Sequence, residues 1–81
     1  MFTMESCPYC VDARRWMDEI LKSDARYGEI PLVIIDEVEE PGLAAAFDYY
    51  YVPTYYIGDE KVHEGAATFG IVKKVFDDAL G

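Results

Sequence analysis

The apolar residues of this chain follow two different spacings, and these divide the sequence into short helical and extended segments. From Cys10 to Leu21 they recur every three or four positions, which predicts an amphipathic helix. Ser6 stands before this segment as its predicted N-cap, and Pro8 fits the first turn, where a missing N–H is not needed. Residues 1–5 alternate in part, and we expect a first strand there.

Two further patterns predict strands. Residues Pro31–Asp36 form a continuous apolar and β-branched run, which is typical of a strand buried on both faces, as in a parallel pair. Thr54–Ile57 and Lys61–Glu64 flank the turn residues Gly58 and Asp59, so we expect an antiparallel hairpin.

Two more helices complete the predicted order. Pro41–Phe47 reads as a short helix, and Thr68 is the predicted cap of a last helix whose apolar side carries Phe69, Val72, Val75, Phe76, Ala79 and Leu80. The order is therefore β-α-β-α-β-β-α. Because a helix joins the first two strands, we expect them to be parallel, with a right-handed crossover. The chain is then one α/β domain over residues 1–81.

The composition favours a packed domain. Of the 81 residues, 52% are hydrophobic and 15% aromatic, which is enough for a core without a structural metal. A formal net charge of −9 argues against binding to nucleic acid and to anionic membrane surfaces. No apolar run approaches the roughly 20 residues of a membrane span, and residues 1–5 lack the basic and apolar regions of a secretory signal. We expect a cytoplasmic protein that is a monomer.

Both cysteines of the chain lie within Cys7-Pro8-Tyr9-Cys10, at the start of the first predicted helix. Two thiols at this spacing can open and close as a disulfide, while the loop between them is too short to stabilise the fold much. Peptide dipoles at a helix N-terminus favour negative charge, so we expect Cys7 to be the nucleophile. Cys10, one turn further on, would be the more buried resolving thiol.

Metal or iron–sulfur binding is an alternative of a different class. Zinc sites usually have four ligands, whereas this chain offers two thiols and His63 as one imidazole, so a dimer would have to supply four thiolates. A non-catalytic interaction module is a third interpretation, and the presence of both cysteines argues against it.

With its cysteine motif on a β-to-α turn, the chain resembles the thioredoxin fold, and the motif is similar to that of dithiol glutaredoxins. The resemblance runs from the first strand to the last helix, nearly the whole chain. Val52-Pro53 falls where this family places its cis-proline, directly before the hairpin. Gly65 matches a glycine of the family just before the last helix.

The resemblance implies a four-stranded mixed sheet flanked by three helices and a dithiol–disulfide oxidoreductase that reduces protein or glutathione mixed disulfides. Glutathione would be the co-substrate, a flavoprotein disulfide reductase is the alternative electron donor, and no cofactor would be tightly bound. Pro8 would stiffen the active-site turn. Substrate or glutathione would meet Tyr9, the backbone of Val52, Pro53 and the N–H groups after Thr68.

The sequence also departs from the glutaredoxin pattern. Met4 stands where dithiol glutaredoxins usually carry a lysine, and Tyr51 where a threonine usually precedes Val-Pro. Glu64, Ala67 and Thr68 replace a second glycine and an aspartate pair. In the family these positions hold the carboxylates and the amine of glutathione. The step from Pro53 to Thr54 and the run from Leu43 to Phe47 look more like thioredoxin.

The remaining aromatic and histidine residues have ordinary structural explanations. Five of the seven tyrosines fall between Tyr49 and Tyr56, and packing on the sheet and helices explains most of them. Tyr51 is the candidate to line a groove beside Pro53. Thiol exchange needs no imidazole, so we expect His63 to be a surface residue. We expect Trp16, on the first predicted helix, to be in the core or partly covered.

Overall fold

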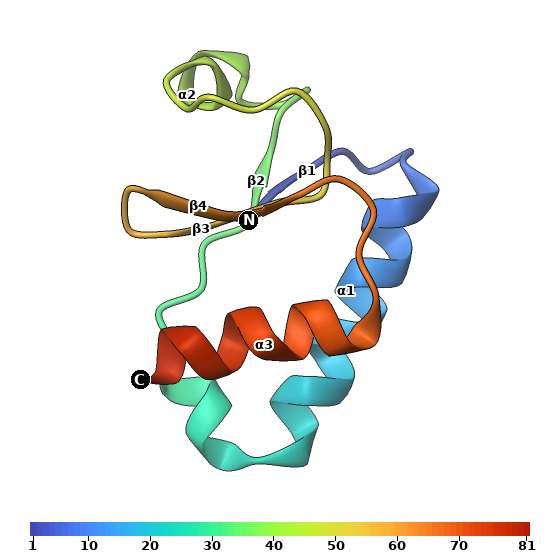
Figure 1. Cartoon of the computed structure of the whole chain (residues 1–81). Coiled ribbons are helices and arrows are strands. Elements are labelled where there is room, and N and C mark those ends of the chain that lie inside the picture. Colours follow the sequence, from blue (N-terminus) through green and yellow to red (C-terminus); the bar gives the residue numbers. More distant parts are fainter.

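A mixed sheet of four strands, in the order β2-β1-β3-β4, lies between helices (Figure 1). The computed structural model describes residues 1–81. In chain order the elements are β1 (Phe2–Thr3), α1 (Pro8–Ser23), the 3-10 helix η1 (Ala25–Glu29), β2 (Ile35–Asp36), α2 (Pro41–Ala45), β3 (Thr54–Ile57), β4 (Glu60–Glu64) and α3 (Phe69–Leu80). The predicted α/β class, with a four-stranded mixed sheet and three α-helices, is confirmed.

The strand pairing follows the predicted connections. β1 pairs in parallel with β2, where Phe2 lies opposite Ile35, and antiparallel with β3, where Phe2 lies opposite Thr54. β3 and β4 form the predicted antiparallel hairpin. Gly58 in its turn has φ +60°, a conformation that is easy for glycine and unfavourable for most other residues.

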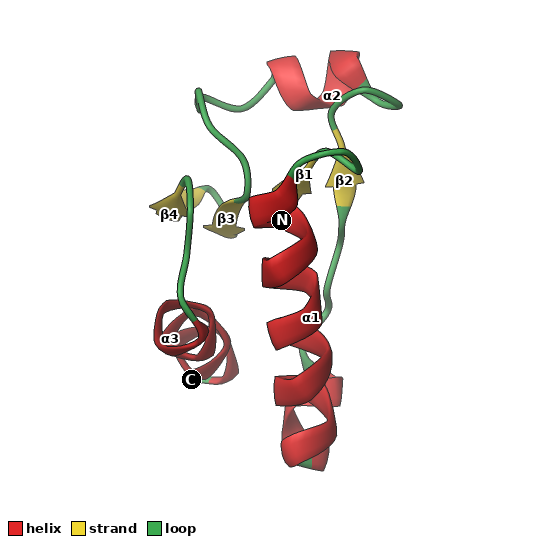
Figure 2. Ribbon diagram, turned by 90° about the vertical axis from the view of Figure 1, so that its right-hand side faces the viewer, coloured by secondary structure: helices red, strands yellow, loops and turns green.

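The two faces of the sheet carry different helices. Figures 1 and 2 show α2 on one face and α1 with α3 on the other. Successive side chains of a strand point to opposite faces, and β1 follows this rule. Met1 belongs to the core cluster on the α1 and α3 side, whereas Phe2 packs on the α2 side, with ring centroids 4.8 Å from Phe47 and 4.9 Å from Tyr49. Thr3 therefore faces α1.

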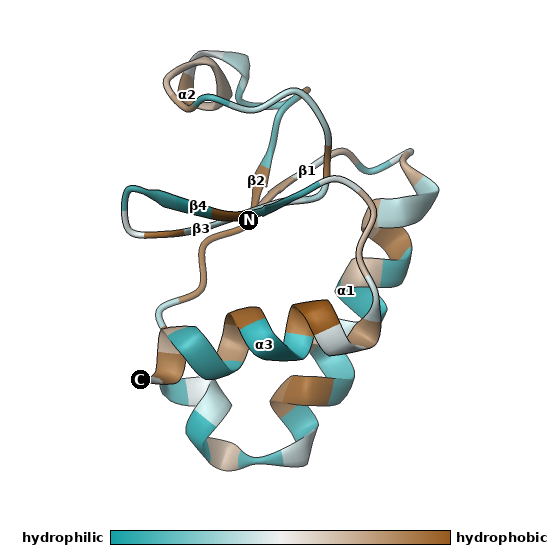
Figure 3. Ribbon diagram, viewed as in Figure 1, coloured by the Kyte–Doolittle hydropathy of each residue, from teal (hydrophilic) through white to brown (hydrophobic).

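Both long helices are amphipathic, as predicted. Figure 3 shows hydrophobic and hydrophilic residues alternating around α1 and α3. The buried residues are Cys10, Ala13, Met17 and Ile20 in α1 and Val72, Val75 and Phe76 in α3. None of the helices combines the length and the hydropathy needed to cross a lipid bilayer.

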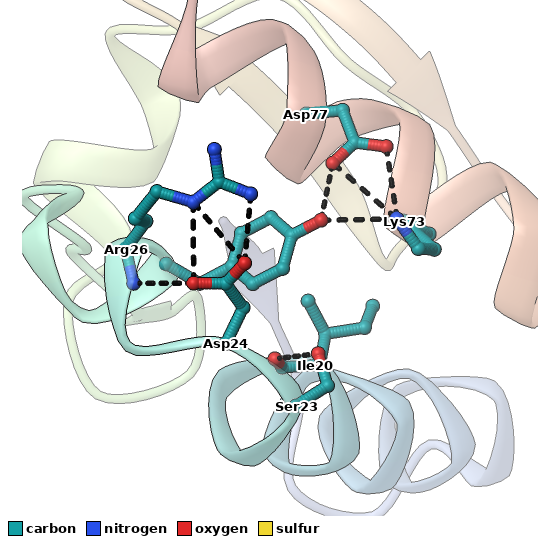
Figure 4. A network of polar contacts seen from close by, with 7 residues as sticks. Ile20, Ser23, Asp24, Arg26, Lys73 and Asp77 are labelled. Atoms are coloured by element: carbon teal, nitrogen blue, oxygen red, sulfur yellow. Dashed lines mark hydrogen bonds and ion pairs between the residues drawn. The ribbon is translucent and has the colours of Figure 1, made fainter.

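A polar network ties η1 to α3 (Figure 4). Asp24 accepts a hydrogen bond from the Arg26 backbone N–H at 2.9 Å, and the Arg26 guanidinium lowers the pKa of this carboxyl to about 2. The hydroxyl of buried Tyr27 donates to Asp77 and accepts from Lys73 at 3.0 Å. The sequence pattern did not predict η1, because its anchors lie on α3, about 50 residues further along the chain.

The predicted buried strand over Pro31–Asp36 is wrong in extent and in burial. Only Ile35–Asp36 forms β2, and Val33 and Ile34 are 64% and 47% exposed. β2 is an edge strand with a neighbour on one side, so the preceding apolar residues are not enclosed between two strands. The first strand is likewise shorter than residues 1–5.

The prediction that Ser6 caps the first helix is also wrong. Cys7 is the N-cap residue, with extended backbone angles and no side-chain hydrogen bond to the helix. Its carbonyl oxygen accepts from the N–H groups of Cys10 and Val11, both at 3.1 Å. The helix therefore begins one residue later than a cap at Ser6 would require.

Candidate functional site

The cysteine pair lies where the chain passes from β1 into α1. Cys7 is the N-cap of α1, Pro8 is in its first turn, and Cys10 follows one turn later. Both are free thiols; Cys7 is half-buried and Cys10 has no exposed surface. The predicted order of exposure is confirmed, and only the sulfur of Cys7 is open to a partner from solution.

The environment of the inner thiol opposes its ionisation in the free protein. Burial raises the pKa of Cys10, and the neighbouring Cys7 sulfur raises it further. The nearby Thr3 hydroxyl and Met4 backbone act in the opposite direction and lower the pKa of Cys10. Because burial and the Cys7 sulfur raise its pKa, Cys10 keeps its proton in the free protein.

Two buried hydroxyl groups lie on the same side of the sheet as Cys10. Thr3 is 1% exposed, and its Oγ1 has no hydrogen-bond partner. Tyr55 is 2% exposed, and its hydroxyl donates only to the weakly accepting sulfur of Met17, at 3.3 Å. Burial is the main cause that raises the pKa of Tyr55, and the nearby Cys10 raises it further. The Tyr55 hydroxyl therefore stays protonated. Neither residue was predicted from the sequence, although a polar residue beside Phe2 in the first strand was a signal for Thr3.

A second backbone segment completes the site from the other end of the chain. The Val52–Pro53 peptide bond is cis, as the position of this pair suggested. Cys7 Sγ lies 3.9 Å from the Val52 carbonyl oxygen, across 45 residues of sequence. The Val52 N–H donates to no protein acceptor, and Pro53 is buried behind it. Val52 therefore offers a free backbone donor beside the outer sulfur.

The loop before Val52 is held by the end of β4. The carboxylate of Glu64 accepts hydrogen bonds from the backbone N–H groups of Tyr50 and Tyr51, the latter at 2.9 Å, and pairs with Lys61 at 2.8 Å. The hydrogen bond from Lys61 is the largest cause that lowers the pKa of Glu64 to about 2, and the two backbone N–H groups lower it further. In the sequence Glu64 stands out only as a departure from a family pattern, and no local signal marks it as an anchor.

Acidic side chains lie near the start of α1, and exposed tyrosines lie in the cysteine motif and beside Val52. A cavity of about 330 Å³ beside the start of α1 is lined by Met4, Glu5, Ser6, Asp36, Val38 and Glu39. Tyr9 and Tyr51 are 58% and 71% exposed, and Tyr51 directly precedes Val52. A separate apolar cavity of about 420 Å³ is bordered by Met1 and Phe76, and neither cavity is lined by a cysteine.

The other residues singled out in the sequence have structural places. Thr68 is the N-cap of α3, and its hydroxyl accepts from the Ile71 N–H at 3.2 Å; no hydrogen bond links it to the cysteines. Trp16 is half-buried against the core. The ring of His63 is partly buried, and its Nε2 lies 3.1 Å from two backbone carbonyl oxygens, those of residues 65 and 66.

No three histidine, cysteine, aspartate or glutamate side chains gather in a way that could hold a metal ion. Comparison with known proteins finds no matching family model, no matching curated protein and no matching solved structure. What the site can do is therefore argued from its own geometry.

Proposed function

We propose that this protein is a dithiol–disulfide oxidoreductase of the thioredoxin fold, most similar to glutaredoxins, which reduces disulfides by cycling Cys7 and Cys10. One observation carries the proposal. A reachable sulfur at the N-cap of α1 and a buried sulfur one turn later share a site with Val52, whose carbonyl oxygen lies 3.9 Å from Cys7 Sγ and whose N–H is unpaired. Helix peptide groups favour negative charge at that end of the helix, which suits a thiolate nucleophile.

The first step joins the protein to its substrate. The thiolate of Cys7 attacks one sulfur of the substrate disulfide, so that a new S–S bond forms and the substrate S–S bond breaks. The departing sulfur takes the electron pair and a proton from solvent. The product is a mixed disulfide between Cys7 and the substrate.

The second step releases the substrate. The Cys10 thiolate attacks Cys7 Sγ, the Cys7–Cys10 disulfide forms, and the substrate sulfur leaves with the electron pair. Cys7 carries no charge once it is in the mixed disulfide, so it no longer raises the pKa of Cys10. The resolving thiol thereby becomes more acidic at the stage when it must react.

The substrate would bind as an extended peptide segment. The N–H and C=O groups of Val52 can pair with the backbone next to the substrate disulfide, while the exposed rings of Tyr9 and Tyr51 give apolar contact. Backbone pairing is tolerant of sequence, so this arrangement suits disulfides in several proteins as well as the peptide-like backbone of glutathione.

The oxidised protein needs an electron donor in a reducing compartment such as the cytoplasm. Glutathione is our first candidate, with its carboxylate on the N–H groups that follow Thr68, at the start of the 12-residue helix α3. A flavoprotein disulfide reductase is the second candidate, because Met4 leaves the site without the lysine usual in glutaredoxins.

Coupled turnover with each donor in parallel tests the proposal. Insulin serves as the protein disulfide, and glutathione with its reductase or a thioredoxin reductase supplies the electrons. We expect reduction that depends on the protein with at least one donor and is abolished in Cys7→Ser. Absence of turnover with both donors, or equal turnover by Cys7→Ser, would overturn the proposal. Turnover with thioredoxin reductase alone would exclude a glutaredoxin role and leave the nucleophile unchanged.

A further inference from the structure

We propose that Thr3 is a catalytic residue of the resolving step, whose hydroxyl donates a hydrogen bond to the Cys10 thiolate while that thiolate attacks the mixed disulfide. This inference rests on the proposed function and assigns a role that the cysteine motif does not contain. Two independent features support it: an unpartnered buried hydroxyl, and the face of β1 from which it projects.

The Thr3 hydroxyl is costly to the fold as it stands. A buried hydroxyl without a partner loses its hydrogen bonds to water and gains none in return. It is the only buried side-chain nitrogen or oxygen atom in the chain that lacks a partner. A role in the reaction, in which the hydroxyl gains an acceptor, is one explanation for a group of this kind.

The geometry supplies that acceptor. Phe2 faces α2, so Thr3 faces α1, the helix in which Cys10 is fully buried. The Thr3 hydroxyl and the Met4 backbone N–H are near enough to Cys10 to lower its pKa, but in the free protein neither donates a hydrogen bond to another protein group. A neutral thiol accepts hydrogen bonds weakly, whereas a thiolate accepts them strongly. The two donors are thus best satisfied when Cys10 is ionised.

The ionisable groups that face Cys10 are Cys7 from the start of α1 and Tyr55 from β3. In the mixed disulfide Cys7 is neutral, and Tyr55 stays protonated because burial raises its pKa. No cation offsets the charge of the resolving thiolate. Hydrogen-bond donors are therefore the means by which this site can stabilise it, and Thr3 is the side-chain donor among them.

The test compares Thr3→Val and Thr3→Ala, which remove the hydroxyl, with Thr3→Ser, which keeps it. Reduced protein reacts with a peptide that holds one disulfide, samples are quenched in acid, and mass spectrometry follows the mixed disulfide and the Cys7–Cys10 disulfide across a range of pH. We expect resolution about tenfold slower in both hydroxyl-free variants at neutral pH, the cost of one hydrogen bond to a charged group. Their rates should recover at higher pH, and Thr3→Ser should resemble the unaltered protein.

Stability should change in the opposite direction from the resolving rate. Thr3→Val removes an unpartnered hydroxyl at nearly constant shape, so its denaturation midpoint should equal or exceed that of the unaltered protein. Wild-type resolution rates and pH profiles in Thr3→Val and Thr3→Ala would overturn the inference, as would lost stability with an unchanged pH profile. If the unaltered protein forms no mixed disulfide, the proposed function itself fails, and this inference with it.

Discussion

At the scale of single residues, the site depends on side chains that hold backbone in place. Glu64 is the clearest case, because its carboxylate accepts from two successive N–H groups just before Val52 and pairs with Lys61. The motif residues Cys7 and Cys10 were predictable because their spacing and their place before an amphipathic segment are local signals. Thr3 and Glu64 were not, because their roles arise from partners that the fold brings near.

Glu64→Gln tests this anchor through acid stability. The pKa of Glu64 is lowered from 4.5 to about 2, so its carboxylate stabilises the fold above about pH 4.5, and this contribution is lost as the pH falls from 4.5 to 2. We expect Glu64→Gln to lower the denaturation midpoint at neutral pH and to converge with the unaltered protein near pH 2. Denaturant titrations at a series of pH values measure the difference.

Glu60→Gln is the matched control, because it removes the same charge from the same strand at an exposed side chain. It should leave the pH dependence close to that of the unaltered protein. Glu64→Gln should also weaken substrate binding several-fold, seen as a higher KM in the insulin assay. A flat difference between Glu64→Gln and the unaltered protein from pH 2 to pH 7 would contradict the anchoring role.

At the scale of elements, the amphipathic helices were predictable and the sheet edge was not. The spacing of apolar residues from Cys10 to Leu21 is a property of the segment itself, and α1 buries the apolar side that this spacing predicts. The apolar run Pro31–Asp36 became a two-residue strand because burial depends on neighbours, and β2 has only one. η1 likewise depends on its contacts with α3.

Ile20→Ala tests whether the buried side of α1 holds the helix to the core. Ile20 is 1% exposed, so truncation leaves a cavity and should cost about 2–5 kcal/mol in the free energy of unfolding. Val11→Ala in the same helix, at a side chain that is 49% exposed, should change that free energy by less than about 0.5 kcal/mol. Urea denaturation measures both, and similar losses would show that burial does not distinguish the two sides.

At the scale of the whole molecule, the proposed function depends on bringing two distant segments together. The α1 start and the Val52–Pro53 step are 45 residues apart and meet because β1 and β3 are neighbours in the sheet. The order of elements and the parallel first pair were predictable from sequence patterns. The acidic cavity beside the start of α1 was not predictable, since Glu5 and Glu39 border it only after β1 and β2 pair.

Trapping of a mixed disulfide tests the central claim most directly. Cys10→Ala retains the outer sulfur and removes the resolving one, so a peptide with one internal disulfide should stay attached to Cys7. Intact-mass measurement should then show one added peptide on Cys10→Ala and none on Cys7→Ala. Absence of the adduct on Cys10→Ala, or an equal adduct on Cys7→Ala, would contradict the account.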